Sequence, residues 1–474
     1  MESTEYDLIV LGAGPVGENI ADRAVKGGLT AALVEHELVG GECSYWACMP
    51  SKALLRSGQV LRAARAVPGA AEVTRGGVDV RAVLKRRDAF ASNWNDEGQV
   101  QWVEGAGISL VRGHARLSAP KQVTVTDADG TETVLTARHA VAVSTGSDAL
   151  VPDIDGLAEA DPWTSREATS AQEVPASLAI IGGGVVATEM ATAYCDLGSE
   201  VTLIARAGLL TGTEPFAGEI VARALSARGV KVLLKTHAVS VTRDAGGVTL
   251  ALSDGQTIRA EEVLVATGRT PRSSDIGVET IGLTPGEWLA TDDTMRVEGF
   301  DWLYACGDVN GRALLTHQGK YQARACGDVI AARALGRPVS DAPWGTHVAT
   351  ADHRAIPQVI FTDPEVATVG LTAAAARAQG YEIRVVDYEI GDVSGAHLHA
   401  DGYQGTARMV VDEKHKVLLG VTMAGPDVGE MLQAASFVVV GEIPLDRLWH
   451  AVPAYPTVSE VWLRLLETYG RPIS

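Results

Sequence analysis

Residues 6–17 read YDLIVLGAGPVG, an apolar run that ends in a glycine-rich turn. Residues 178–187 repeat this arrangement as LAIIGGGVVA. Each stretch is followed by a helix-like segment and a second apolar run, which reaches Glu35 in the first copy and Arg206 in the second. Strand, turn, helix and strand in this order form a β-α-β unit, so the sequence predicts an α/β protein that uses this unit twice.

The first turn has the pattern Gly12-x-Gly14-x-x-Gly17 between the expected strand and helix. Gly12 permits a tight turn, Gly14 lets a pyrophosphate approach the backbone, and Gly17 allows the helix to pack closely on the strand. Glu35 ends the second expected strand, where a carboxylate can bind ribose hydroxyls. Together these features predict a dinucleotide site rather than a glycine turn in an unrelated sheet.

The second turn contains Gly182 and Gly184 and has Ala187 at the position of the third glycine. Its second expected strand ends with Arg206 and supplies no acid there. An arginine at this position attracts a 2′-phosphate, whereas a carboxylate would repel it. This difference favours NADPH over NADH, with a solvated charge at a strand end as the alternative.

A cysteine pair, Cys43 and Cys48, lies in the segment GGECSYWACMPSK of residues 40–52. On a regular helix, residues five apart are separated by roughly 7.5 Å of rise, whereas a disulfide needs Cα atoms roughly 4.4–6.8 Å apart. A bridge would therefore need a distorted first turn, which Pro50 favours because it removes one helical N–H. A helix N-terminus and Lys52 would favour the thiolate. The pair is interpreted as redox-active, the alternative being two buried free cysteines.

Composition excludes several classes of protein. The chain has 474 residues, which is enough for two to four domains, and a net charge of -19, which makes nucleic acid an unfavourable partner. No apolar run is long enough to cross a membrane, and the acidic N-terminus does not resemble a signal peptide. We expect a cytoplasmic protein.

The five cysteines are too few for a disulfide scaffold and show no zinc spacing, so no metal site is expected.

The chain resembles the pyridine nucleotide-disulfide oxidoreductases, which include glutathione reductase, dihydrolipoamide dehydrogenase and mercuric reductase. The resemblance rests on the motifs above and on three others, ATGRTP at 266–271, YACGDV at 304–309 and FTDPEVATVG at 361–370. It implies two nested Rossmann-like domains for FAD and NAD(P) and a C-terminal α+β dimerisation domain. The expected boundaries are 1–150 for the FAD domain, 151–274 for the NAD(P) domain, 275–343 for the return to the FAD domain, and 344–474 for the dimerisation domain.

The resemblance also implies roles for individual residues. Cys43 would face the substrate and Cys48 would contact the flavin, while Lys52 and Glu189 would pair beside the flavin ring. Asp308 would bind the ribityl chain. The other residues expected at the cofactors are Gly41, Thr145, Gly146, Gly268, Arg269 and Gly307.

One segment departs from the family pattern. Members carry a catalytic histidine followed by Pro-Thr and then a glutamate, but here the segment reads AYPTVSE, with Tyr455 at the histidine position and Glu460 retained. Tyrosine is a poor base at neutral pH, so efficient dihydrolipoamide oxidation is not expected; His450 is an alternative base. Mercuric reductases carry a tyrosine near this position, but they also use a C-terminal cysteine pair that is absent from residues 466–474.

These observations predict a homodimeric, NADPH-dependent FAD enzyme that passes electrons through Cys43 and Cys48 to an unidentified small acceptor. Tyr455 and Glu460 would act on the active site of the partner subunit. Tyr45 and Trp46, between the cysteines, are candidates for an aromatic surface that binds a flat substrate. Alternatives are a dihydrolipoamide dehydrogenase, a quinone reductase, a mercuric reductase-like enzyme and a redox-sensing flavoprotein.

Overall fold

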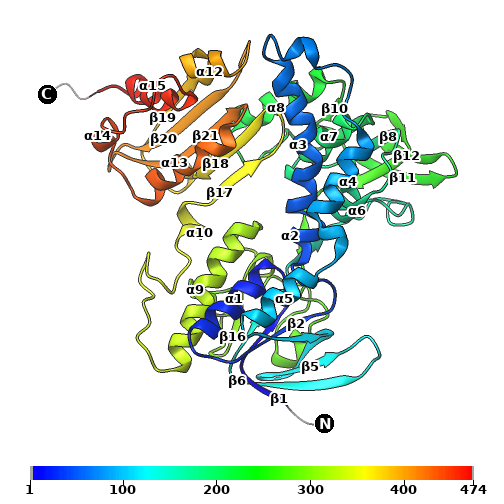
Figure 1. Cartoon of the computed structure of the whole chain (residues 1–474), viewed down its shortest axis with the longest axis vertical. Helices are drawn as coiled ribbons and strands as arrows, with labels where there is room; N and C mark the ends of the chain where they lie inside the picture. Colours follow the sequence, from blue (N-terminus) through cyan, green and yellow to red (C-terminus); the bar gives the residue numbers. More distant parts are fainter. Residues whose placement is uncertain (1–3, 472–474) are drawn as a thin grey trace. The chain divides into compact units, whose positions relative to one another are not determined.

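The computed structural model describes residues 4–471 and confirms a mixed α/β fold (Figure 1). The chain divides into two compact units, each built from three segments. Unit 1 comprises Met1–Pro50, Asp88–Leu150 and Arg269–Asp352, and unit 2 comprises Ser51–Arg87, Val151–Gly268 and His353–Ser474. Among residues 4–471, no helix combines the length and apolar character that crossing a membrane requires.

Unit 1 is organised around a seven-stranded sheet. Its parallel part has the order β3-β2-β1-β6, with β16 also pairing with β6, and β5 and β4 extend the sheet antiparallel from β6. The strands are β1 (Thr4–Leu11), β2 (Ala31–Glu35), β3 (Ser109–Arg112), β4 (His114–Ala119), β5 (Gln122–Thr126), β6 (Glu132–Val143) and β16 (Leu303–Ala305).

The strands of the parallel part are apolar on both faces, and helices cover one of these faces. Helix α1 (Pro15–Lys26) and helix α9 (Thr316–Ala334) lie side by side (Figure 1). Their small residues form one buried core with β1 and β2, and a second core fills the opposite face. Unit 1 also contains α5 (Glu97–Gly105), the short helix α2 (Gly41–Tyr45), and a ribbon of β7 (Ser147–Ala149) with β15 (Arg269–Pro271).

Unit 2 contains a second parallel sheet, with the order β10-β9-β8-β14. Its strands are β8 (Ser177–Ile181), β9 (Glu200–Ala205), β10 (Lys231–Leu234) and β14 (Glu262–Val265). Helix α7 (Val185–Asp196) connects β8 to β9, and α8 (Pro215–Ala227) connects β9 to β10. A three-stranded antiparallel sheet follows β10, made of β11 (Ala238–Asp244), β12 (Gly247–Leu252) and β13 (Thr257–Ala260). The predicted second β-α-β unit is therefore present.

The C-terminal part of unit 2 is an antiparallel sheet with the order β17-β18-β21-β20-β19. Its strands are β17 (Pro357–Ile360), β18 (Glu365–Gly370), β19 (Ile383–Glu389), β20 (Thr406–Asp412) and β21 (Val417–Gly425). Helix α13 (Val428–Val440) packs on β18 and β21 (Figure 1). The remaining helices are α11 (Ala373–Ala378), α12 (Ser394–His399), α14 (Leu445–Leu448) and α15 (Val461–Tyr469).

The two units do not coincide with the four expected domains: they differ from the expected boundaries at residues 51–87, 269–274 and 344–352, and unit 2 contains most of both the NAD(P) and dimerisation segments. Helix α3 (Cys48–Arg65) begins in unit 1, but from Ser51 onward it belongs to unit 2, together with most of α4 (Val80–Phe90). The reason is packing, because Leu54, Leu55 and Val83 are buried in the same core as strands β8 and β9. Sequence order alone predicts that this segment belongs to the FAD domain.

Candidate active site

The first glycine turn of unit 1 connects β1 to α1 in a compact geometry. Gly12 has a positive φ of 96°. A Cβ atom on Gly17 would lie 1.9 Å from the Gly12 carbonyl oxygen, so this position has no room for a side chain. A Cβ atom on Gly14 would meet no protein atom within 4 Å. The first turn of α1 therefore presents an open, backbone-lined cradle of the kind that anions bind at helix N-termini.

Glu35 ends β2 and points back at this turn. The side chain is buried, and its Oε2 accepts a hydrogen bond from the Ala13 backbone N–H at 2.8 Å. Its Oε1 accepts one from the Glu37 N–H, also at 2.8 Å. These two backbone donors fix the orientation of the carboxylate, and its remaining lone pairs are suited to ribose hydroxyls.

The two cysteines lie on separate helices. Cys43 is in α2, the chain breaks from helical geometry at Trp46 (φ −136°, ψ 0°), and Cys48 begins α3. This break is the distortion that the pairing argument required. Gly41, at the start of α2, has a φ of 55°, and a Cβ atom there would lie 2.8 Å from the Gly14 Cα. The cysteine segment therefore begins directly against the glycine turn.

Hydrogen bonds and burial control the charge of the thiols. The pKa of the Cys43 thiol is raised well above its usual range, first because it hydrogen-bonds the Cys48 side chain and second because it is partly buried. The Cys48 Sγ lies 3.3 Å from the Thr316 hydroxyl at the start of α9. The structure therefore places a hydroxyl group against the pair. The two residues are distant in the chain, and no local sequence pattern indicates this contact.

Replacing Thr316 with valine is expected to make the thiolate harder to form. A hydrogen bond to a charged acceptor contributes about 1.5–3 kcal/mol, so the pH at half-ionisation of the reduced pair should rise by about 1 to 2 pH units. The rate of alkylation by iodoacetamide, measured against pH, reports this midpoint. Thr316→Ser keeps the hydroxyl and is the control. An unchanged midpoint in the valine variant would show that the contact at 3.3 Å does not stabilise the thiolate.

Of the two aromatic residues between the cysteines, Tyr45 is not available for an aromatic surface that binds substrate. Tyr45 is 1% exposed and its hydroxyl donates to the Val39 carbonyl at 2.9 Å. Trp46 is half-buried and contacts the Tyr45 ring edge-to-face, with centroids 5.6 Å apart. The expectation was wrong for Tyr45, because burial of the large apolar ring outweighs exposure once the hydroxyl has a partner.

Asp308 is held by Ser147, for which no local sequence pattern predicts a role. Ser147 Oγ donates to Asp308 Oδ2 at 2.6 Å and accepts from Arg269 Nε at 2.5 Å. Arg269 also lies 3.7 Å from the Asp308 carboxylate. These contacts connect the turn after β6, the β7–β15 ribbon and the Gly307 turn. Arg269, Gly307 and Asp308, which the resemblance implies at the cofactor, therefore lie together in unit 1.

The turn after β6 is fixed by the segment that follows β15. Thr145 Oγ1 donates to the Arg272 carbonyl at 2.5 Å, and the Arg272 N–H donates to the Gly146 carbonyl at 3.0 Å. Gly146 has a φ of 80°. Both residues therefore define the path of the backbone beside Ser147.

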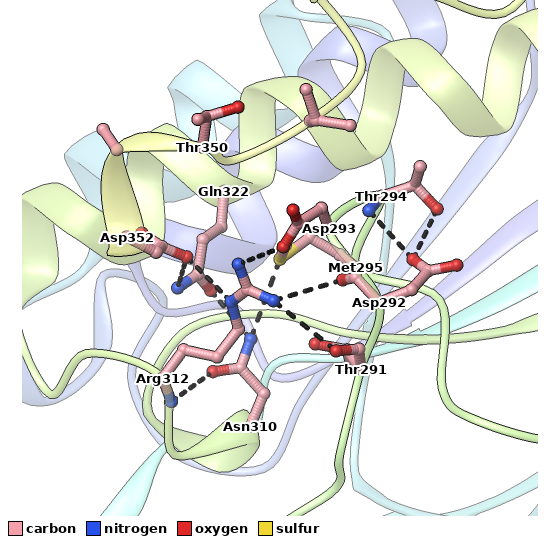
Figure 2. Close-up of polar contacts among 12 residues, drawn as sticks. Thr291, Asp292, Asp293, Thr294, Met295, Asn310, Arg312, Gln322, Thr350 and Asp352 are labelled. Carbon is pink, nitrogen blue, oxygen red and sulfur yellow. Dashed lines mark hydrogen bonds and ion pairs between the residues drawn. The ribbon is translucent and has the colours of Figure 1, made fainter. Parts of the chain in front are cut away.

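A buried polar network adjoins the Gly307 turn through Gln322. Figure 2 shows its members Asn310, Arg312, Gln322 and Asp352. Gln322 on α9 accepts from the Gly307 N–H at 2.8 Å and from the Asn310 side chain at 2.9 Å, and it donates to Asp352 at 2.9 Å. Arg312 bridges Asp352 and Asp293, at 2.9 and 2.8 Å. Such a satisfied network restricts the turn to one conformation.

The second glycine turn lies between β8 and α7 in unit 2. A Cβ atom on Gly182 would lie 2.2 Å from the Ala266 carbonyl oxygen, whereas one on Gly184 would meet nothing within 4 Å. Ala187 is fully buried. Gly268, after β14, has a φ of 155°, and Arg206 is exposed directly after β9. This turn presents the same open helix N-terminus as the first.

Lys52 and Glu189 form an ion pair in unit 2, as the resemblance implied. Lys52 Nζ lies 2.8 Å from Glu189 Oε2, and the Phe361 N–H donates to Glu189 Oε1 at 2.9 Å. Glu189 is only 3% exposed, and the Lys52 ammonium lies 4.9 Å from the centre of the Phe361 ring. The carboxylate is fully partnered, so the lysine is held in one position.

Comparison with known proteins identifies the family. Residues 6–323 match the family model "Pyridine nucleotide-disulphide oxidoreductase", and residues 356–465 match its dimerisation domain. The chain belongs to the pyridine nucleotide-disulphide oxidoreductases. The family uses FAD and NAD(P)H, so the chain is an NAD(P)H-dependent flavoprotein of the disulfide oxidoreductase class.

Mercuric reductases and dihydrolipoyl dehydrogenases match nearly the whole chain. A mercuric reductase of Acidithiobacillus ferrooxidans is 30% identical, over 100% of this chain and 84% of that protein. A dihydrolipoyl dehydrogenase of Halobacterium salinarum is also 30% identical, over 98% and 96%. The flavoprotein disulfide reductase RclA of Escherichia coli has the same fold, with a TM-score of 0.83 at 22% identity over 98% of this chain and 99% of that one. These comparisons leave the acceptor open.

The C-terminal segment carries Tyr455 at the position where the resemblance implies a histidine. Tyr455 is 75% exposed, whereas Glu460 is buried and pairs with Arg464 at 2.6 Å. The structure thus does not bring the Tyr455 ring and the Glu460 carboxylate together as a hydrogen-bonded pair. His450 is exposed on the segment that follows α14.

Proposed function

We propose that the protein is a homodimeric reductase that uses NADPH and FAD to reduce a small acceptor through Cys43 and Cys48. The observation that carries this proposal is the position of the two thiols, one on α2 and one beginning α3, with α2 starting against the Gly14 turn. When bound, FAD passes electron pairs between the nicotinamide and the cysteines.

The residues of unit 1 fit the flavin nucleotide. The open cradle at Gly14 and the N-terminus of α1 suit a pyrophosphate, because a Cβ atom would occupy the space a phosphate needs. Glu35 would accept from ribose hydroxyls, and Asp308, oriented by Ser147, would bind the ribityl chain. The remaining predicted residues, Gly41, Thr145, Gly146, Arg269 and Gly307, shape the backbone around them.

We assign the two thiols different tasks. Cys48, which contacts the Thr316 hydroxyl, would be the thiol next to the flavin. Cys43 would attack the acceptor, and its raised pKa means that it keeps a proton until a base removes it. Lys52, fixed by Glu189, would lie beside the flavin ring. Tyr455 and Glu460 of one subunit would complete the active site of the other.

The acceptor is tested by measuring turnover of the purified holoprotein with NADPH and a panel of small disulfides, dihydrolipoamide with NAD⁺, quinones and Hg(II). Reduction of a disulfide that is lost in Cys43→Ser supports the proposal. Quinone reduction that survives in Cys43→Ser would instead indicate direct reduction by the flavin. Absence of turnover with every acceptor would favour a redox-sensing flavoprotein.

Arg206 is expected to set the choice of nucleotide. It follows β9 directly and is exposed, where it can pair with a 2′-phosphate. NADPH should therefore reduce the enzyme with a higher kcat/KM than NADH, and Arg206→Ala should shrink that ratio about tenfold, the equivalent of about 1.4 kcal/mol. Stopped-flow reduction with each nucleotide measures this ratio. Equal kcat/KM values in the wild type would contradict the assignment.

A further inference from the structure

A second cation lies beside Arg206, on the neighbouring strand. Strands β9 and β10 are parallel, and Leu234, the last residue of β10, pairs with Ala205, the last residue of β9. The residues that follow are therefore Arg206 and Lys235, at the same carboxyl edge of the sheet. The Thr236 N–H donates to the Ala205 carbonyl at 3.3 Å, which ties the two strand ends together. Adjacent strands are only about 4.8 Å apart.

The backbone at Lys235 adopts an uncommon conformation. Its φ is 58°, in the left-handed region that residues other than glycine rarely occupy. The conformation is maintained by the next residue, since Thr236 is only 3% exposed and its hydroxyl lies 3.0 Å from the Ser253 hydroxyl. A lysine held in this way at a strand end has a fixed starting point for its side chain, and such local strain is more common at binding sites.

Neither cation has an acidic partner in the part of the chain that the structure describes. Both side chains are exposed, and within residues 4–471 neither forms an ion pair or a side-chain hydrogen bond. The carboxylate close to Thr236 is that of Asp254, which already accepts hydrogen bonds from the Gln256 N–H at 3.0 Å and the Gln256 side chain at 2.8 Å. Two like charges at adjacent strand ends repel each other, and an anion between them would relieve this repulsion.

The first β-α-β unit of the same chain provides a contrast. There β2 ends at Glu35, which pairs in register with Arg112 at the end of β3. Arg112 is engaged within the protein, donating to Asp96 at 2.6 Å and to the Glu37 carbonyl at 2.8 Å. In unit 1 the two strands thus end in an acid and a base that is engaged within the protein. In unit 2 the corresponding strands end in Ala205 and Leu234, and the residues that follow are two cations without an acidic partner among the described residues.

We propose that Lys235 and Arg206 together bind the 2′-phosphate of NADPH, and that Lys235 is a specificity-determining residue for the nucleotide. The inference rests on the proposed NADPH-dependent function and extends it. In a β-α-β nucleotide site, the end of the second strand lies at the ribose 2′ position. Lys235 follows the third strand, β10, next to that end, so its ammonium group can reach a phosphate at the 2′ position. A 2′-hydroxyl carries no charge, so it offers the ammonium group much less attraction.

The test compares Lys235→Ala, Arg206→Ala and the double variant with a matched control, Lys231→Ala. Lys231 is exposed at the opposite, amino end of the same strand β10. Flavin reduction by NADPH and by NADH is followed by stopped flow at low salt, and binding of adenosine 2′,5′-bisphosphate is measured by calorimetry. Lys235→Ala should raise KM for NADPH and Kd for the bisphosphate about tenfold, with kcat unchanged. The control should match the wild type.

Two further results are expected, one from the dependence on salt and one from the conservative variant. The effect of Lys235→Ala should shrink at high ionic strength, because an exposed phosphate contact is screened, and Lys235→Arg should retain the NADPH preference. Unchanged NADPH kinetics in Lys235→Ala, or equal losses with NADPH and NADH, would overturn the inference while leaving the role of Arg206 intact. A wild-type holoprotein whose flavin is reduced by neither nucleotide would instead overturn the proposed function itself.

Discussion

Replacing Cys48 with serine is expected to abolish the reduction of disulfide acceptors, with a fall in kcat/KM of about 10³-fold or more. Serine cannot form a disulfide with Cys43, so no dithiol is available for exchange. The long-wavelength absorbance of a thiolate next to oxidised flavin should also be absent at every stage of reduction. Anaerobic turnover assays and absorbance spectra of the holoprotein measure both effects.

Replacing Cys43 with serine should remove the same activity but leave a different spectrum. Cys48 would lose the thiol with which it shares a proton, and the Thr316 hydroxyl at 3.3 Å would remain to stabilise its thiolate. The long-wavelength band should therefore be present without any reductant. Cys195→Ser, which changes a half-buried thiol on α7, is the control and should behave like the wild type. Identical spectra in all three variants would rule out the assignment of the pair.

Replacing Tyr455 with histidine is expected to speed dithiol–disulfide exchange by about 10²-fold. Cys43 holds its proton tightly, because its pKa is raised by the hydrogen bond to Cys48 and by burial, so exchange needs a base. Imidazole titrates near neutral pH, whereas phenol titrates near pH 10. Tyr455 is 75% exposed, so the substitution should not disturb the fold. Single-turnover rates with a panel of disulfides measure the gain.

Two further variants test this prediction. His450→Ala should leave exchange unchanged, because His450 is exposed and makes no side-chain contact with Glu460 within the described chain. Glu460→Gln in the Tyr455→His background should reduce the gain if the glutamate orients the new imidazole. If Tyr455→His leaves exchange with every disulfide unchanged while quinone reduction is intact, disulfides are not the natural acceptors and the cysteines act as an internal electron store.

The fold could be predicted from local patterns because its deciding features are local. The turns at Gly12–Gly17 and Gly182–Ala187, each between an apolar strand and a helix, are sufficient for two β-α-β units. The break between Cys43 and Cys48 was also predictable, since disulfide geometry is incompatible with a regular helix over that spacing. These arguments need only residues close together in sequence.

The rest of the site depends on contacts between distant parts of the chain. Thr316 contacts Cys48 across a separation of 268 residues, and Ser147 reaches Asp308 across 161. No periodicity or spacing in a single sequence indicates such pairs. The same reason explains Lys235, whose position beside Arg206 depends on the register of two strands. Tyr45 differs, because its hydroxyl bonds the Val39 carbonyl only six residues away, and no spacing in the segment indicates this local contact.

The central claim is that Cys43 and Cys48 carry an electron pair in addition to the one on the flavin. Anaerobic titration of the holoprotein with dithionite tests it most directly, with absorbance spectra recorded after each addition and free thiols counted at the end. The wild type should take up about four electron equivalents per chain and Cys43→Ser about two, because a disulfide is a two-electron couple. Uptake of only about two equivalents by the oxidised wild type, with no gain in free thiols, would contradict the account.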